Sequence, residues 1–62
     1  DSLPLSEARR VAIDNFERHY LNVLMARNNG KINNSAKEAG ITTRQLHKLM
    51  VKYGLRKESF KQ

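Results

Sequence analysis

Apolar side chains recur at helical spacing through the first half of the chain, and they fall into two sets. One set shares a single face of a helix drawn over residues 6–28, and the other lies on an adjoining face about 100° around the axis. The first set is Ala12, Phe16, Tyr20, Val23 and Leu24, and the second is Leu21 and Met25. A surface helix packs on a protein core through one apolar face. Two apolar faces therefore predict a helix that packs against two surfaces.

The flanking residues mark where this first helix begins and ends. No Gly or Pro occurs in residues 6–28, and the composition favours helix throughout. Ser6 is the expected N-terminal cap, and Gly30 suits the left-handed position that follows a helix. The prediction is one helix about 35 Å long. The weak helix formers Asp14-Asn15 mark where a bend would fall.

The two apolar faces of this helix are expected to pack differently. The rest of the chain is long enough to cover one face. The face of Leu21 and Met25 would then pack on a second copy of the chain. The alternative is that Leu21 and Met25 are exposed, since single exposed apolar residues are normal on proteins.

The second half predicts two shorter helices that meet at a glycine. The first runs from about Asn33 to Ala39 and is stopped by Gly40. The second covers residues 43–53, with Thr42 as its cap. Residues 55–62 are polar and basic, and a frayed tail is expected there.

The corner at Gly40 is typical of a helix-turn-helix, in which two helices cross steeply through a turn of three or four residues. Ala36 is small enough to let the helices approach, and Ile41 fills the turn. The inward stripe of the last helix is Leu46, Leu49, Met50 and Tyr53. Its opposite face carries Arg44, His47, Lys48 and Val51, flanked by Thr43 and Gln45. Such a helix fits the DNA major groove, where Arg, Lys and Gln pair with base edges.

The charge is confined to the same half. Residues 1–30 contain four Arg against four acidic residues, so they are neutral. Residues 31–62 contain eight Lys and Arg against two Glu, which accounts for the whole net charge of +6. A one-sided basic surface favours a polyanion such as DNA. The alternative interpretation is a solvated face that keeps the protein soluble.

Other functional classes have little support in these residues. Cysteine is absent, and His19 and His47 have no metal partners at ligand spacing, so no metal site and no cofactor is expected. No apolar run reaches the length of a membrane span, and no membrane partner is expected. No paired carboxylates, nucleophile–base set or phosphate-binding glycine loop occurs, so we do not expect an enzyme.

From Phe16 to Leu55 the chain reads FERHYLNVLMARNNGKINNSAKEAGITTRQLHKLMVKYGL, which resembles the Fis-type DNA-binding domain. That domain ends the NtrC-like activators of sigma-54 RNA polymerase and forms the second half of the nucleoid protein Fis. The positions that carry the resemblance, without gaps, are Phe16-Glu17-Arg18, Tyr20-Leu21, Leu24, Gly30, Ala36, Gly40-Ile41, Leu46 and Tyr53-Gly54-Leu55. Two departures are Lys31, where the family commonly has Asn, and Arg44, an arginine shifted by one position.

The resemblance implies an all-α, homodimeric domain over residues 1–62, with a dimerisation helix at 6–28, a helix-turn-helix at 33–53 and a tail at 56–62. The expected base contacts are Thr43, Arg44, Gln45, His47 and Lys48, and which of the first three reads a base stays open. The expected phosphate contacts are Lys31, Asn33, Asn34, Thr42 and Lys52. The expected dimer interface is Phe16, Tyr20, Leu21, Leu24 and Met25.

The function implied is sequence-specific binding of double-stranded DNA in the bacterial cytoplasm, at the nucleoid. The domain would hold a larger activator, a partner of sigma-54 RNA polymerase, at its enhancer. Because the chain opens on Asp1, we expect a piece of a longer protein. Two alternatives stay open: a free-standing nucleoid protein of the Fis kind, and a dimerisation or interaction module that binds no DNA.

Overall fold

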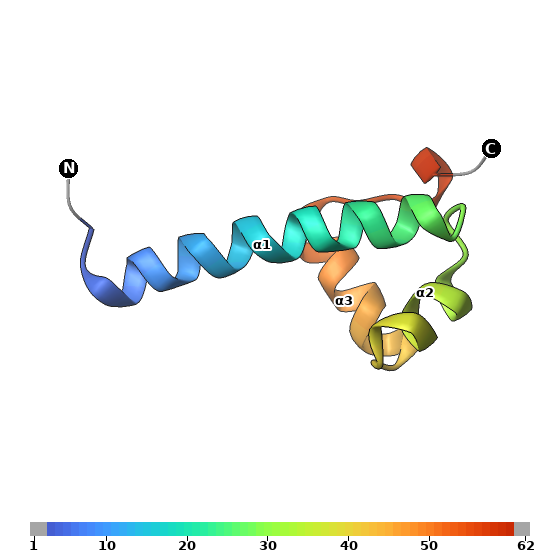
Figure 1. Ribbon diagram of the computed structural model, residues 1–62, viewed down its shortest axis with the longest axis horizontal. Coiled ribbons are helices and arrows are strands. Elements are labelled where there is room, and N and C mark those ends of the chain that lie inside the picture. The colour runs from blue at the N-terminus through green and yellow to red at the C-terminus, as the bar shows by residue number, and fades with distance from the viewer. Residues whose placement is uncertain (1–2, 61–62) are drawn as a thin grey trace.

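The computed structural model describes residues 3–60, and the part it describes is all helical. A long helix, α1, spans Leu5–Arg27, and two shorter ones, α2 and α3, span Ile32–Ala39 and Thr43–Tyr53. A single 3-10 turn, η1, follows at Lys57–Phe60. The shorter elements gather around the C-terminal half of α1, and its N-terminal half extends past them alone (Figure 1). The predicted all-α fold is confirmed.

Helix α1 begins one residue before the predicted start and lacks the predicted cap. Pro4 is the capping residue, with φ −54° and ψ 151°, and no side chain caps the helix. The Pro4 carbonyl accepts from the Ala8 amide at 2.9 Å, so Ser6 already lies inside the first turn. Proline fixes its own φ, and this starts the helix without help from Ser6. The helix then continues unbroken past Asp14-Asn15.

The core lies between the C-terminal half of α1 and the two shorter helices. Its fully buried apolar side chains are Leu21, Leu24, Met25, Ala36, Leu46 and Met50. Helix α1 contributes Leu21, Leu24 and Met25, which are 2%, 1% and 0% exposed. These three residues are i, i+3 and i+4, so they form one narrow stripe facing the helix-turn-helix.

The predicted dimer interface is therefore wrong for Leu21, Leu24 and Met25. Leu21 and Met25 were expected to meet a second copy, yet they are buried within one chain, and Leu24 is buried with them. Phe16 and Tyr20, the other two residues of the expected interface, are 66% and 43% exposed. Both sets have helical spacing, and periodicity alone does not say which set the rest of the chain covers.

The corner between α2 and α3 has the predicted form. Gly40 has φ 74°, a left-handed conformation that costs a glycine little. The next amide, of Ile41, donates to the Ala36 carbonyl at 3.0 Å and closes the end of α2. Thr42 then caps α3: its Oγ1 accepts from the Gln45 amide at 3.1 Å. In return Oε1 of Gln45 accepts from the Thr42 amide at 3.0 Å, which completes a capping box.

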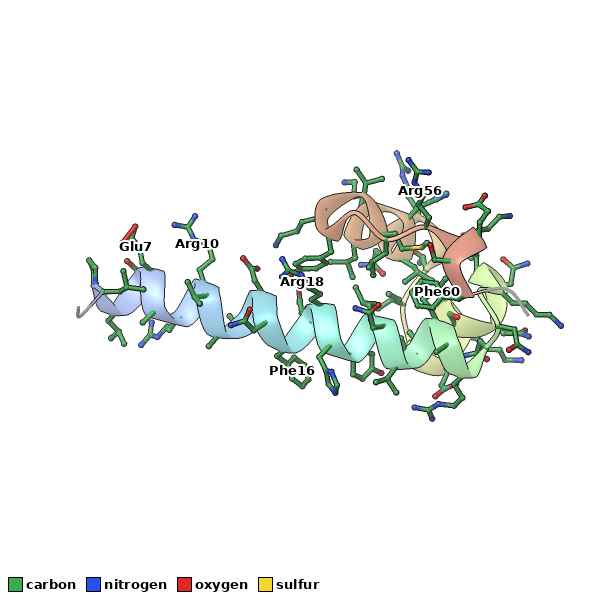
Figure 2. All side chains as sticks on the ribbon, turned by 90° about the horizontal axis from the view of Figure 1, so that it is seen from above. Glu7, Arg10, Phe16, Arg18, Arg56 and Phe60 are labelled. Atoms are coloured by element: carbon green, nitrogen blue, oxygen red, sulfur yellow. The ribbon has the colours of Figure 1, made fainter. Side chains whose placement is uncertain are left out.

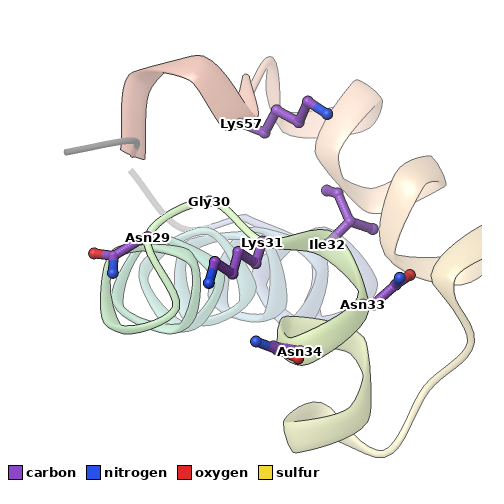
Figure 3. A pocket seen from close by; sticks show the side chains of 7 residues that line it. All are labelled: Asn29, Gly30, Lys31, Ile32, Asn33, Asn34 and Lys57. Atoms are coloured by element: carbon purple, nitrogen blue, oxygen red, sulfur yellow. The ribbon is translucent and has the colours of Figure 1, made fainter.

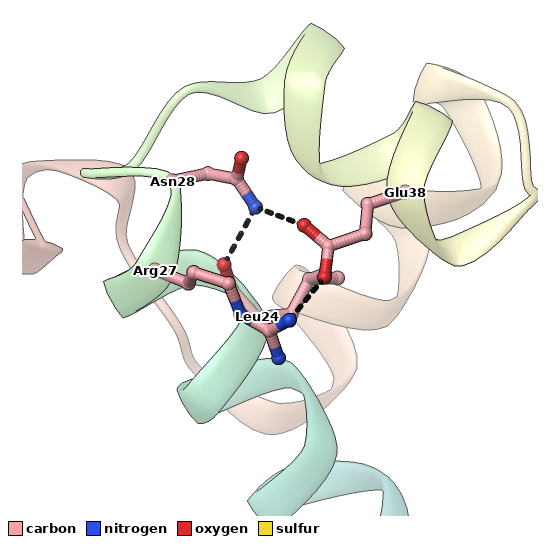
Figure 4. Close-up of polar contacts among 4 residues, drawn as sticks. All are labelled: Leu24, Arg27, Asn28 and Glu38. Carbon is pink, nitrogen blue, oxygen red and sulfur yellow. Dashed lines mark hydrogen bonds and ion pairs between the residues drawn. The ribbon is translucent and has the colours of Figure 1, made fainter.

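A polar clamp fixes α2 against the end of α1 (Figure 4). Glu38 of α2 contacts two residues of this end: its Oε2 lies 2.7 Å from Nη1 of Arg27, and its Oε1 accepts from Nδ2 of Asn28 at 3.1 Å. The same Asn28 amide group donates to the Leu24 carbonyl at 2.9 Å, near the last turn of α1. The C-terminal end of α2 is thus held beside the end of the long helix.

The chain after α3 folds back onto the long helix, so a frayed tail is wrong for residues 55–60. Leu55 and Phe60 are half-buried and pack against the core. The tail crosses so close to Gly30 that a side chain there would collide with the Lys57 carbonyl. Gly30, with φ 78°, is thus required both for its conformation and for this approach. Residues 61–62 lie outside the described part of the chain.

Candidate nucleic-acid interface

Helix α3 presents one polar face to solvent. Arg44, His47, Lys48 and Val51 are all exposed and lie opposite Leu46 and Met50, which are buried. We call these four exposed residues the reading face. The capping box at Thr42 sets the first turn of α3 and so fixes the direction in which Arg44 leaves the helix.

The reading face continues into the start of α2 and into the tail through three shallow hollows. One is lined by Ile32, Thr43, Arg44 and His47. A second shares Ile32 and His47, adds Met50 and Val51, and reaches Leu55 and residues 56–58 of the tail. The third shares Ile32 and Lys57 and covers residues 29–34 (Figure 3). Since neighbouring hollows have residues in common, they form one continuous surface.

Positive charge dominates this continuous surface. The cations that line it are Lys31, Arg44, Arg56 and Lys57, with the carboxylate of Glu58 as the single negative group among the lining residues. We call these four cations together with His47 the basic face. They come from three separate segments, and the fold brings them together. A surface of this kind concentrates a polyanion near the protein.

Two residues of the basic face were missed by sequence reasoning. Arg56 and Lys57 belong to the segment predicted to fray, so no site was assigned to them. A signal was present in the sequence: Leu55 and Phe60 are apolar residues in an otherwise polar segment, and both pack on the core. Their docking is what brings Arg56 and Lys57 beside the start of α2.

The residues predicted to contact phosphate divide into two groups. Lys31, Asn33 and Asn34 surround the open hollow at the start of α2, and Figure 3 shows Lys57 of the tail across from them. Helix α2 has no side-chain cap, so the amides of its first turn are free of side-chain partners. Those amides and the lysines together suit an anionic oxygen.

Lys52 does not join this group. Its Nζ lies 3.4 Å from Oδ1 of Asp14 on α1 and 5.2 Å from the centre of the Tyr53 ring. It therefore leaves α3 toward the long helix and lines none of the three hollows. The predicted phosphate role of Lys52 does not fit this geometry. Lys52 follows Val51 of the reading face directly, and one residue of an α-helix turns the side-chain direction by about 100°, here toward α1.

Thr42 and Gln45 are occupied by the capping box described above. The Thr42 hydroxyl accepts from an amide of α3, and the Gln45 side-chain oxygen accepts from the Thr42 amide. A base contact by the Gln45 oxygen would break the box. Of the three candidates for base contact left open by the sequence, Arg44 is the one that also lines a hollow as a charged side chain. Thr43 lines the same hollow.

A second polar cluster fixes the far end of α3 to the middle of α1. The Tyr53 hydroxyl donates toward Oε1 of Glu17 at 2.5 Å and toward Oδ1 of Asp14 at 3.1 Å. The guanidinium of Arg18 lies 5.7 Å from the centre of the Tyr53 ring. The hydrogen bond to Glu17, partial removal from water and the hydrogen bond to Asp14 all raise the pKa of the Tyr53 phenol above its ordinary range. Tyr53 thus anchors α3 while neutral.

The exposed side of α1 carries an apolar stripe of Phe16, Tyr20 and Val23. These side chains are 66%, 43% and 44% exposed, and the two rings lie 5.9 Å apart. Figure 2 shows Phe16 on the side of α1 away from Arg56 and Phe60. An apolar groove beside the stripe runs between Phe16 and Tyr20 on one side and Ala39, Ile41 and Leu49 on the other. Three neighbouring large apolar side chains and a groove favour a partner surface.

Comparisons with models of protein families, with curated proteins and with solved structures find no match to this chain. Within residues 3–60, none of the helices combines the length and the apolar character that crossing a membrane requires.

Proposed function

We propose that this chain is a helix-turn-helix DNA-binding domain that acts as a homodimer. The observation that supports it best is the continuity of the reading face of α3 with the start of α2 and the tail. Four cations from these segments line one surface: Lys31, Arg44, Arg56 and Lys57. The resemblance to Fis-type domains supports the further role of holding a sigma-54-dependent activator at its enhancer.

Binding divides between two kinds of contact. Lysines and amides around the start of α2 grip phosphates, which supplies most of the affinity and carries no sequence information. The reading face enters the major groove, and Arg44, near its N-terminal end, is placed to pair with a guanine edge. Two contacts with α1 keep the helix-turn-helix in a fixed position: Tyr53 of α3 bonds to Glu17, and Glu38 of α2 pairs with Arg27. The phosphate contacts and the reading face thereby keep a fixed distance from each other.

The second copy is proposed to pack on the apolar stripe. Helix α3 has only 11 residues, so one reading face covers few base pairs, and two copies related by a twofold axis would read two half-sites. Phe16, Tyr20 and Val23 are exposed on α1 and line none of the three hollows of the basic face, so pairing there leaves each reading face free. This keeps Phe16 and Tyr20 from the predicted interface and leaves out Leu21, Leu24 and Met25, which are buried within one chain.

The experiment is selection of duplexes from a random library, followed by measurement of Kd for the selected duplex and for random DNA. Arg44→Ala is expected to cost about 1–3 kcal/mol at the selected duplex and less at random DNA. Arg10→Ala is the matched control, because it removes the same charge from the exposed N-terminal half of α1. It is expected to change both Kd values little.

A different result would favour the interaction module instead. If no duplex binds at low salt, the basic face is a solvated surface, and the apolar stripe and its groove become the functional surface. If duplexes bind but Arg44→Ala changes both Kd values equally, the protein binds DNA without reading bases through this residue.

A further inference from the structure

Val51 is the most exposed large apolar side chain in the described part of the chain, at 80%. It lies in the last turn of α3, a helix whose other apolar residues all face inward. Leu46 and Met50 are buried, and Leu49 is half-buried. Valine is also a weak helix former, so an exposed helix position offers it no benefit of its own. The residue thus departs from the pattern of the helix that carries it.

Along the reading face, the neighbours of Val51 are cationic and polar. It belongs to the reading face, where His47 and Lys48 precede it by one helical turn and Arg44 by two. It also lines a hollow with the charged or polar His47, Arg56, Lys57 and Glu58 and the apolar Ile32, Met50 and Leu55. An apolar protein partner seated on Val51 would have to remove these charged groups from water, which is unfavourable. DNA avoids that cost, because its phosphates pair with the cations while base edges face the helix.

The chemistry of the major groove points to one kind of contact. Among the groups that bases present there, the methyl at C5 of thymine is the apolar one, and small apolar side chains contact it. We propose that Val51 is a specificity-determining residue that packs on the C5 methyl of a pyrimidine. In unmodified DNA that pyrimidine is thymine, and in methylated DNA it is also 5-methylcytosine. The inference rests on the proposed DNA-binding function and assigns part of its specificity.

The geometry of α3 places this methyl relative to the arginine contact. Val51 follows Arg44 by seven residues, which is two turns or about 10 Å along the helix. The two side chains leave α3 in nearly the same direction, so they meet different base pairs of the same half-site. Valine is stiff about its first side-chain bond, so it loses little freedom when it packs on a methyl group.

The test replaces each thymine of the selected duplex in turn by deoxyuridine, which removes only the C5 methyl. With the wild-type protein, one position per half-site is expected to lose about fourfold in affinity, the value for burying one methyl-sized group. With Val51→Ala, the loss at that position is expected to vanish. Val51→Ala puts a better helix former at an exposed site, so the variant folds. A parallel set of duplexes carries 5-methylcytosine in place of cytosine.

Val11→Ala is the matched control, because Val11 is an exposed valine on α1, far along the chain from the reading face. It is expected to keep the deoxyuridine effect. If 5-methylcytosine at one position raises the affinity of the wild type but not that of Val51→Ala, the methyl group that Val51 contacts is the one on the methylated cytosine. A selected duplex that binds tightly but shows no Val51-dependent effect of any methyl overturns this inference and leaves the proposed function standing. Absence of any duplex binding overturns both.

Discussion

The hydroxyl of Tyr53, at the last residue of α3, lies 2.5 Å from Oε1 of Glu17 in the middle of α1. Asp14 lies one turn earlier on α1, and its Oδ1 is 3.1 Å from the same hydroxyl. One phenol proton thus serves two carboxylates. Lys52 and Arg18 place positive charge beside them. The contact joins segments 36 residues apart and fixes the C-terminal end of the reading helix.

Tyr53→Phe is expected to lower the melting temperature by several degrees. The ring still packs, but two carboxylates lose the donor that holds them beside α3, and hydrogen bonds to charged groups are among the stronger ones. Thermal unfolding followed by circular dichroism measures the effect. Tyr20→Phe is the control, because Tyr20 is an exposed tyrosine on the same long helix. Equal melting temperatures for the wild type and Tyr53→Phe would show that the hydroxyl does not anchor α3.

The ionisation of Tyr53 is expected to be delayed in the folded protein. The chain has two tyrosines, so in the Tyr20→Phe variant the absorbance of phenolate reports Tyr53 alone. Its pKa is raised by the hydrogen bond to Glu17 and by partial removal from water. The folded variant should therefore ionise at higher pH than the same variant in denaturant.

The sign of the linked stability follows from this shift. The folded protein holds the phenol proton more tightly than the unfolded chain, whose tyrosine has a pKa near 10. The contribution is fully present below about pH 10 and is lost as the pH rises beyond it. A loss of stability between neutral pH and pH 9 that disappears in Tyr53→Phe would contradict this assignment.

The local features of the fold could be predicted from the sequence. Gly40 ends α2 and Thr42 caps α3 through contacts within about four residues of the chain. The ends of α2 and α3 were therefore predicted to within one residue. The inward stripe of α3 was also predictable, because Leu46 and Met50 have helical spacing in a short helix with a single apolar face.

The long-range features could not be predicted. Helix α1 has two apolar faces, and the contacts that hold α3 beside one of them, from Tyr53 to Asp14 and Glu17, join residues far apart in the chain. The candidate site has the same limit. The position of Lys57 depends on Phe60 docking against the core and on the absence of a side chain at Gly30, and neither relation is visible in local spacing.

Phe16→Glu is expected to convert a dimer into a folded monomer. Phe16 is 66% exposed, so the substitution leaves the core of the protomer intact while placing charge in the apolar stripe. Sedimentation gives the oligomeric state and circular dichroism gives the helix content. Val11→Glu adds the same charge to α1 outside the stripe and should leave the dimer unchanged.

Leu21→Asp provides a contrasting outcome. Leu21 is 2% exposed, so a carboxylate there has no access to water within one chain and should unfold the protomer. If the wild type sediments as a monomer at tens of micromolar, or if Leu21→Asp dissociates a dimer while keeping its helix content, the apolar stripe is not the interface.

Lys52 and Lys57 look alike in the sequence but have different places in the fold. Lys57 lies beside Lys31 on the basic face, whereas Lys52 turns to Asp14 on α1. Lys57→Ala is expected to weaken selected and random duplexes by similar factors, because phosphate contacts carry no sequence information. It should also reduce the slope of log affinity against log salt by about 0.9, the value for one phosphate neutralised.

Lys52→Ala removes the same charge from the chain, yet it should leave the slope unchanged, since Lys52 lines none of the hollows. Affinities measured at several salt concentrations compare the two variants directly. Equal reductions of the slope would mean that only the net charge matters, and the tail would then have no specific place in DNA binding.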